Sequence, residues 1–212
     1  FERDQIWDAD GVARQVEESL KALGTDYVDL LQFHSGGDDV FDNDELWAFL
    51  AKLKEEGKIR HLGISIGANT NDYQTGRAPE VGAETIQVVY NRLDRAPEEK
   101  VLPLCRELDL GVLARVPLAS GYLSGKYKPG ASFDETDVRS RRNREQVDEK
   151  LREVERIGRD EVPDDVPMAE WALAWCLQNP AVSCVIPGCK NVEQVRSNAR
   201  AADLGDLRGA RR

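Results

Sequence analysis

The sequence has 212 residues, of which 41% are hydrophobic and 32% are charged, and its formal net charge at pH 7 is −10. This length and composition allow a sizeable buried core and favour a single domain over residues 1–212. The negative charge repels phosphate backbones and anionic membrane surfaces, so we expect neither nucleic acid nor a membrane as a partner. No apolar run approaches the roughly 20 residues of a membrane-spanning helix, and no signal segment opens the chain, which favours a cytoplasmic location.

Helix and strand signals alternate along the chain. Apolar residues at helical spacing behind a capping residue indicate helices, and short apolar runs between turn residues indicate strands. In chain order we predict a helix over 8–23, a strand over 27–34, a helix from 43 or 44 to 57, a strand over 58–65, a loop with one short helix over 67–82, a strand over 85–91, a helix over 97–108 and a strand over 111–118. The remaining predictions are an ordered loop over 121–144, helices over 145–159 and 167–178, a strand over 181–187, a helix over 191–202 and a polar tail after Leu204.

Strands that are hydrophobic on both sides and alternate with helices favour an α/β fold with a parallel sheet. Five such strands fit a partial (β/α)8 TIM barrel, about its last five strand–helix units, because a complete barrel typically needs about 250 residues. No Gly-x-Gly-x-x-Gly follows the first strand, which weakens an open dinucleotide-binding sheet without excluding it. The chain opens with Phe1 and has Met168 as its only methionine, so we expect a fragment that lacks the first strands.

The cysteines and the polar residues at strand ends give no sign of a metal site. The four cysteines, Cys105, Cys176, Cys184 and Cys189, lack C-x-x-C spacing and nearby histidines. We therefore expect buried, reduced thiols rather than disulfides or metal ligands. No carboxylates cluster at the strand ends, which also makes a two-carboxylate hydrolase a poor fit.

Chemistry in such barrels takes place where the strands finish. The polar residues there include His34, Ser65, Gln87 and Arg115. Taken singly, each has an ordinary structural interpretation. His34 can be a structural histidine with its hydrogen bonds satisfied, and Ser65 a turn residue. Gln87 can hydrogen-bond a buried backbone group, and Arg115 can form an ion pair. The closing segment IPGCKNVEQVRSN places a Gly turn, a lysine and a helix start together, an arrangement that favours an anion such as phosphate.

Five ordered segments resemble motifs of the aldo-keto reductase superfamily, the nicotinamide-dependent reductases built on a (β/α)8 barrel. They are SLKALGTDYVDLLQFH, GKIRHLGIS, IQVVYNRLDR, ARVPLASGYLSGKY and VIPGCKNVEQVRSN, and together they extend over nearly the whole chain. The resemblance implies an NAD(P)H-dependent oxidoreductase that interconverts a small-molecule carbonyl compound, an aldehyde or a ketone, and an alcohol.

The resemblance also implies roles for individual residues. His34 is expected to orient and polarise the substrate carbonyl during hydride transfer, and Ser65 and Gln87 to hydrogen-bond the nicotinamide carboxamide. Arg115 stands where many members carry an aromatic ring, and its planar guanidinium can stack on the nicotinamide instead. The other implied cofactor-binding residues are Val116, Leu118 and Ser120 along the pyrophosphate, Lys126 at a phosphate, and Gly188, Lys190, Gln194 and Asn198 near the adenosine.

Two further residues depart from the family pattern. Gln194 replaces an arginine found in many members, which leaves Lys190 as the main local cation for a 2′-phosphate; we expect NADP(H), with NAD(H) as the alternative. Ile66 stands where the family often has an asparagine, and its side chain cannot hydrogen-bond the carboxamide.

The family's catalytic tyrosine, lysine and aspartate belong to the first barrel strands, and no segment of this sequence matches them. We therefore expect the chain alone to be catalytically inactive. One alternative is a nucleotide-binding regulatory or redox-sensing relative without efficient turnover. Another is a different barrel enzyme, such as an isomerase or aldolase, with a phosphate site near Gly188. The sequence indicates neither the particular substrate nor the oligomeric state.

Overall fold

A computed structural model describes residues 7–205, which form two compact units. Unit 1 contains residues up to 88 together with 98–112, and unit 2 contains 89–97 and the residues from 113 onward. The boundary passes through strands β3 (Thr85–Val89) and β4 (Gly111–Arg115). A single domain over 1–212 stays a prediction, and most of the tail predicted after Leu204 lies outside the described residues.

Five strands form one sheet in the order β1-β2-β3-β4-β5. Strand β1 (Val28–His34) pairs in parallel with β2 (Ile59–Ser65), β2 pairs in parallel with β3, and β4 pairs in parallel with β5 (Cys184–Ile186). The predicted α/β fold with a parallel sheet is therefore confirmed. Its interpretation as part of an eight-stranded barrel stays a prediction.

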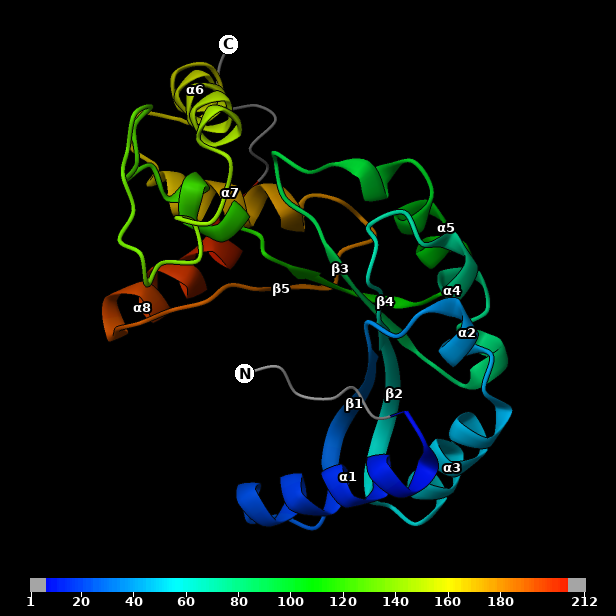
Figure 1. The fold of residues 1–212 in the computed structure, drawn as a ribbon. Coiled ribbons are helices and arrows are strands. Elements are labelled where there is room, and N and C mark those ends of the chain that lie inside the picture. The colour runs from blue at the N-terminus through cyan, green and yellow to red at the C-terminus, as the bar shows by residue number, and fades with distance from the viewer. Residues whose placement is uncertain (1–6, 206–212) are drawn as a thin grey trace. The chain divides into compact units, whose positions relative to one another are not determined.

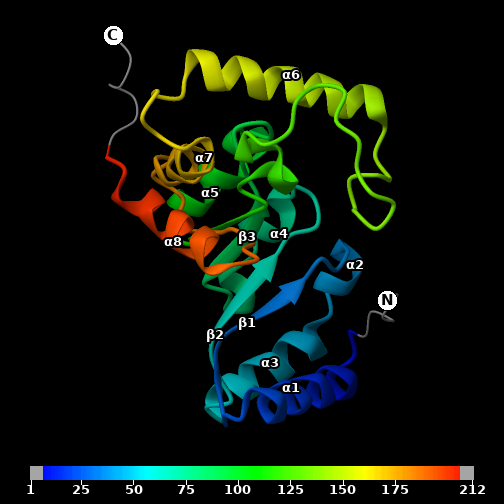
Figure 2. The same cartoon turned by 90° about the vertical axis from the view of Figure 1, so that its left-hand side faces the viewer.

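Two helices of unit 1, α1 (Ala9–Leu23) and α3 (Asp44–Glu55), pack beside its strands. The Asp8 carboxylate caps α1 by accepting a hydrogen bond from the Gly11 amide at 2.8 Å, and Asn43 caps α3 in the same way. Figures 1 and 2 show α1 and α3 side by side next to β1 and β2. The other helical segments of unit 1 are α2 (Asp38–Phe41), α4 (Asp72–Gly76), η1 (Pro79–Val81) and α5 (Val101–Glu107), and η2 (Ala96–Glu98) spans the boundary.

An aromatic cluster packs behind the end of β1. The ring of Phe33 lies 5.9 Å from that of Phe41 and 5.4 Å from that of Trp47, measured between centroids. The Trp47 indole Nε1 donates a hydrogen bond to the Phe41 carbonyl at 2.6 Å. This packing ties α2 and α3 to the strand and fixes the backbone that leads into His34.

Unit 2 has a hydrophobic core of its own, formed mainly by two of its helices. Helix α6 (Arg144–Asp160) buries Val147, Leu151, Val154 and Ile157, which recur every three or four residues along one face. In Figures 1 and 2, α6 lies above α7 (Met168–Leu177) and crosses it rather than running alongside it. The remaining helical segments are η3 (Ala119–Ser124), α8 (Val192–Arg200) and η4 (Ala201–Asp203).

Most predicted elements are confirmed, with differences at their ends. The strand predicted over 111–118 ends at Arg115, because Val116 has φ 56° and a left-handed residue cannot continue a strand. The strand predicted over 181–187 is shorter, Cys184–Ile186. The predicted loop over 121–144 opens with the last part of η3 and contains no further helix or strand until α6.

The prediction of buried cysteines is half wrong. All four thiols are free, as predicted, and burial raises the pKa of Cys105 and of Cys176 to about 12. Cys184 and Cys189 are exposed, however. The apolar run that contains Cys184 forms only a three-residue strand in which just the middle residue is half-buried, so its apolar character does not imply burial.

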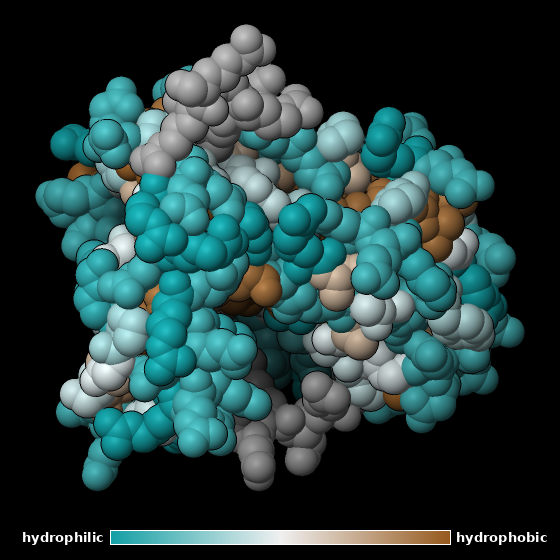
Figure 3. Space-filling view, turned by 90° about the horizontal axis from the view of Figure 1, so that it is seen from above, coloured by the Kyte–Doolittle hydropathy of each residue, from teal (hydrophilic) through white to brown (hydrophobic). Residues whose placement is uncertain are grey.

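Hydrophilic residues cover most of the face in Figure 3, with hydrophobic residues in small scattered patches. Within residues 7–205, no helix is long and apolar enough to cross a membrane. The same residues include no group of three or more His, Cys, Asp or Glu side chains placed to hold a metal ion.

Candidate functional site

Three predicted site residues of unit 1 lie side by side in the sheet: His34 and Ser65 are the last residues of β1 and β2, and Gln87 is the middle residue of β3. The register of the sheet pairs His34 on β1 with Ser65 on β2, and Ser65 with Gln87 on β3. Backbone hydrogen bonds fix this level, from the Ser35 amide to the Ser65 carbonyl at 2.8 Å and from the Ile66 amide to the Gln87 carbonyl at 3.1 Å. Parallel pairing therefore brings together three residues that span 53 positions of sequence, from 34 to 87.

Two of these side chains, Ser65 and Gln87, belong to a chain of hydrogen bonds in which each residue donates to the next. Gln32 donates from Nε2 to Gln87 Oε1 at 3.2 Å, and Gln87 donates from its own Nε2 to Ser65 Oγ at 3.0 Å. Ser65 is completely buried, and Gln32 and Gln87 are half-buried. Sequence reasoning missed Gln32. The strand pattern could have identified it. Side chains two residues apart on a strand point to the same face, and Gln32 lies two residues before His34.

His34 is exposed and lines a groove of about 920 Å³ beside α1. Apolar side chains from α1, β1 and α3 line the same groove: Val12, Val16, Leu31, Phe33, Leu46 and Leu50. The imidazole is thus accessible at the strand end, beside an apolar surface, and its role in polarising a carbonyl stays a prediction.

The turn after His34 is held from α4. Gln74, which is 1% exposed, donates from Nε2 to the Gly36 carbonyl at 3.0 Å and to the Asp38 carboxylate at 2.8 Å. Ser35 adopts φ 57°, so the chain turns sharply as soon as the strand ends. These contacts fix the position of the His34 backbone.

Ile66, the departure from the family pattern, is 1% exposed and belongs to the core. The hydrogen bonds that an asparagine would offer at this position are therefore replaced by apolar packing, and Ser65 and Gln87 remain as the polar pair of this level.

The predicted pyrophosphate segment lies in unit 2 and contains an unusual run of left-handed residues. Val116, Ala119, Ser120 and Gly121 have φ values of 56°, 49°, 58° and 88°. The Val116 carbonyl is held by the Asn91 side chain, whose Nδ2 donates to it at 3.1 Å. The Ala119 amide donates to the Val116 carbonyl at 2.9 Å and the Gly121 amide to the Leu118 carbonyl at 2.8 Å, so these two N–H groups are engaged within the turn. Leu118 is half-buried and packs against the core of unit 2.

Two arginines from the long loop hold Ser120. Arg142 donates from Nη2 to Ser120 Oγ at 2.9 Å, and Arg139 donates from Nη1 to the Ser120 carbonyl at 3.4 Å. Arg139 also forms a bidentate pair with Asp137, which holds the pKa of that carboxyl well below its usual range, and it lies 4.4 Å over the Tyr127 ring. The loop predicted as ordered is thus anchored to the segment that it follows.

The closing segment also forms a capped turn. The Asn191 side chain accepts a hydrogen bond from the Gln194 amide at 2.9 Å, and Gln194 Oε1 accepts one from the Lys190 amide at 2.7 Å. Gln194 is therefore engaged in the turn itself. Lys190 is exposed and close enough to Asp137 to contribute to the low pKa of that carboxyl. Gly188 and Lys126 are exposed, and Asn198 is half-buried.

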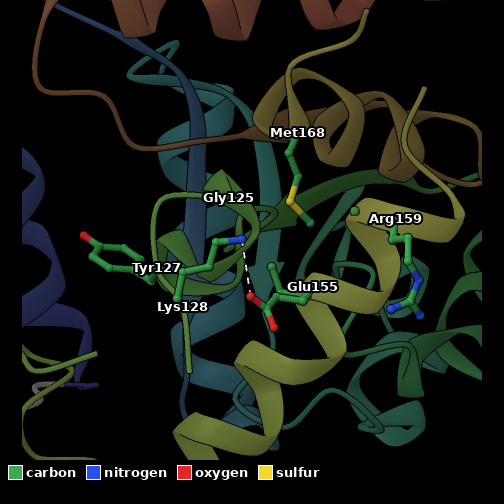
Figure 4. Close-up of a pocket in the computed structure, with 8 residues that line it drawn as sticks. Gly125, Tyr127, Lys128, Glu155, Arg159 and Met168 are labelled. Atoms are coloured by element: carbon green, nitrogen blue, oxygen red, sulfur yellow. Dashed lines mark ion pairs between the residues drawn. The ribbon is translucent and has the colours of Figure 1, made fainter. Parts of the chain in front are cut away.

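Unit 2 also has a pocket, of about 440 Å³, and none of the predicted site residues lines it. It lies between the end of η3, α6 and the start of α7. Figure 4 shows Lys128 and Glu155 facing each other across it, with Nζ and Oε1 3.3 Å apart, while the Tyr127 ring points away from them. The Lys128 ammonium and the Glu155 carboxylate thus pair with each other, and Arg159 pairs with Asp160.

The predicted site residues are divided between the two units. The structure brings His34, Ser65 and Gln87 together in unit 1, and it places Arg115 and the phosphate-segment candidates in unit 2. Arg115 ends β4, where its carbonyl accepts a hydrogen bond from the Tyr90 amide at 3.2 Å. A common cavity that includes Arg115 stays a prediction.

Comparison with known proteins decides the family. The profile of the aldo/keto reductase family matches residues 6–208. This chain belongs to the aldo/keto reductase family. The predicted family membership is therefore confirmed.

Relatives within the family match most of this chain. The uncharacterized oxidoreductase YqkF of Bacillus subtilis (strain 168) is 36% identical over 200 residues, which cover 92% of this chain and 61% of YqkF. The NADH-specific methylglyoxal reductase of Escherichia coli (strain K12) is 31% identical over 202 residues, which cover 92% of this chain and 60% of that protein. The holo form of the aldo-keto reductase AKR11C1 from Bacillus halodurans superposes with a TM-score of 0.77 at 30% identity, covering 95% of this chain and 64% of the other. The chain thus spans about three fifths of the length of these aldo-keto reductases.

Proposed function

We propose that this chain is the nucleotide-binding part of an NAD(P)H-dependent aldo-keto reductase that interconverts a small carbonyl compound and an alcohol. The observation that carries the proposal is the alignment of His34, Ser65 and Gln87 at one level of the sheet, with the last two joined by a hydrogen bond. Family membership supports the reaction class.

The residues present fit a nicotinamide nucleotide. The series Gln32–Gln87–Ser65 ends on a hydroxyl that retains its own proton, and a carboxamide carbonyl is a suitable acceptor for it. In unit 2, the exposed Lys190 ammonium and the start of α8 beside it suit a phosphate group. When bound, the reduced nicotinamide supplies the hydride.

We assign His34 the role of polarising the substrate carbonyl, since its exposed imidazole can donate a hydrogen bond to an oxygen placed above the strand ends. The proton that completes alcohol formation requires a donor of tyrosine type. No segment of this chain matches the family's tyrosine, lysine and aspartate, so we propose that the chain alone binds the nucleotide without efficient turnover, as part of a larger barrel.

The preference for NADP(H) is part of the proposal, and it rests on Lys190 as an exposed cation beside the capped turn. The name of the Escherichia coli relative says that protein is NADH-specific, whereas the name of the aldo-keto reductase yakc of Schizosaccharomyces pombe gives NADP(+), so nucleotide choice differs within the family. The small-molecule carbonyl substrate and the cytoplasmic location also stay predictions.

Titration of the chain with NADPH and NADH, followed by quenching of tryptophan fluorescence, tests the proposal. We expect saturable binding of both, tighter for NADPH, and a loss of about tenfold for Ser65→Ala, which corresponds to about 1.4 kcal/mol for one hydrogen bond. We expect Lys190→Ala to weaken NADPH and to leave NADH unchanged. Absence of binding to the folded chain would overturn the nucleotide assignment, and rapid reduction of a generic aldehyde by the chain would overturn its dependence on outside residues.

A further inference from the structure

Gln32 and Gln87 hydrogen-bond although they lie on strands that are not neighbours. Gln32 belongs to β1 and Gln87 to β3, and β2 runs between them. At the level of Gln32 the register places Gly63 on β2 and Thr85 on β3. The hydrogen bond therefore passes over β2 at its glycine.

Gly63 leaves the space that this contact needs. A Cβ atom at that position would lie 3.2 Å from Gln32 Cγ and 2.2 Å from Thr85 Oγ1. Such distances leave no room for a side chain without displacing both neighbours. The absence of a side chain on β2 thus allows Gln32 to reach the polar pair one level higher.

The hydrogen bonds run in one direction. Since Gln87 Oε1 accepts from Gln32, Gln87 turns its Nε2 toward Ser65, whose buried Oγ accepts, so the Ser65 proton is not donated to Gln87. The reverse direction would consume the Ser65 proton on Gln87 and leave only lone pairs for the ligand. It would also leave the Gln32 amide N–H groups buried without a partner, whereas in the observed direction the Gln32 atom without a partner is Oε1. Unpaired buried N–H groups are the rarer case in proteins.

We propose that Gln32 is a positioning residue that sets the orientation of the Gln87 amide and thereby makes Ser65 a hydrogen-bond donor to a ligand carbonyl. The inference rests on the proposed function, in which this carbonyl belongs to the nicotinamide carboxamide. Ile66 increases the dependence on Ser65, because its buried apolar side chain offers no second donor.

The test measures two affinities for each variant of the chain, one for NADPH and one for 2′-phospho-ADP-ribose, which lacks the nicotinamide. Gln32→Leu removes the donor, and Gln32→Glu offers only an acceptor and so favours the reversed direction. We expect both variants to weaken NADPH about five- to tenfold, and Gln32→Glu more, with 2′-phospho-ADP-ribose changed by less than about twofold. The control is Thr85→Val at the same level, since the Thr85 hydroxyl has no hydrogen-bond partner among the described residues; it should change neither affinity.

A ligand-side measurement needs no variant. The 3-acetylpyridine analogue of NADPH keeps the carbonyl and lacks the amide N–H groups, so the unaltered chain should bind it within about threefold of NADPH, and the thionicotinamide analogue more weakly. Equal effects of Gln32→Leu on both ligands, or no effect on either, would overturn the role of Gln32 alone. Equal affinity of the unaltered chain for 2′-phospho-ADP-ribose and NADPH would contradict the proposed hydrogen bond from Ser65 to the nicotinamide carboxamide. If the chain binds neither, the proposed function fails as well.

Discussion

At the scale of single residues, Gly36 shows how a missing side chain fixes the strand end that carries His34. A Cβ atom at Gly36 would lie 2.2 Å from Phe33 Cζ. Phe33 cannot give way easily, because its ring packs against Phe41 and Trp47. The Gly36 carbonyl is in turn held by the buried Gln74 side chain. The turn after His34 is therefore determined by close packing as much as by backbone freedom.

We predict that Gly36→Ala lowers the free energy of unfolding by about 1–3 kcal/mol, the usual effect of overpacking a filled site. Urea unfolding followed by tryptophan fluorescence measures it. Gly188→Ala is the matched control, since a Cβ there meets no atom within 4 Å, and it should change stability by less than about 0.5 kcal/mol. Equal stability of the two variants would contradict this account of the turn.

At the scale of secondary structure, α8 is attached to α7 by polar contacts. None of the nine described residues of α8 is buried, and Val192 and Val195 are 59% and 51% exposed. Glu170 on α7 is buried, and its Oε1 accepts hydrogen bonds from Ser197 Oγ at 2.8 Å and from Arg200 Nε at 3.1 Å. Since α8 carries Gln194 and Asn198, Glu170 positions the segment predicted to meet the adenosine.

The pKa of Glu170 makes this attachment dependent on pH. Burial acts to raise the pKa, but the hydrogen bonds from Arg200 and Ser197 outweigh it, and the net shift is downward. A lowered pKa in the folded state stabilises the fold above the ordinary carboxyl pKa, and this contribution is lost as the pH falls through the lowered value.

We therefore expect Glu170→Gln to cost about 1–3 kcal/mol at neutral pH and progressively less as the pH falls below about 4. Urea unfolding of both proteins across this range measures the difference. Glu193→Gln on the exposed first turn of α8 is the control. A difference between Glu170→Gln and the unaltered chain that stays constant down to pH 3 would contradict the assigned hydrogen bonds.

At the scale of the whole molecule, net charge is the property that decides which partners are unfavourable. The chain carries 39 acidic and 29 basic residues, and much of the face in Figure 3 is hydrophilic. Some of the basic side chains are paired with acidic side chains at the surface, as in Lys58–Glu17 and Arg60–Asp29. The summed field therefore disfavours polyanions.

We predict that the chain does not bind duplex DNA at about 50 mM salt with a dissociation constant below roughly 100 µM, the weak end of nonspecific DNA binding. Fluorescence anisotropy of a labelled duplex measures this, with NADPH binding in the same buffer as a control for folded protein. Salt-dependent DNA binding in the micromolar range would show that local basic surface outweighs the net charge.

The sequence by itself determined the features that depend on neighbours along the chain. Helix starts at Asp8, Asn43 and Asn191 follow from capping side chains a few residues from the amides they bind, and the alternation of helix and strand follows from local hydrophobic spacing. The five motifs likewise identified the family, because each is contiguous.

Only the tertiary structure decided the features that depend on distant residues. The bond between Gln32 and Gln87 joins positions 55 apart, and it requires Gly63 on the strand between them. The early end of β4 follows from the left-handed Val116, whose carbonyl is bound by Asn91 from another part of unit 2. Register, burial and packing arise from pairing between segments, and local residue patterns do not specify which distant segment a residue will meet.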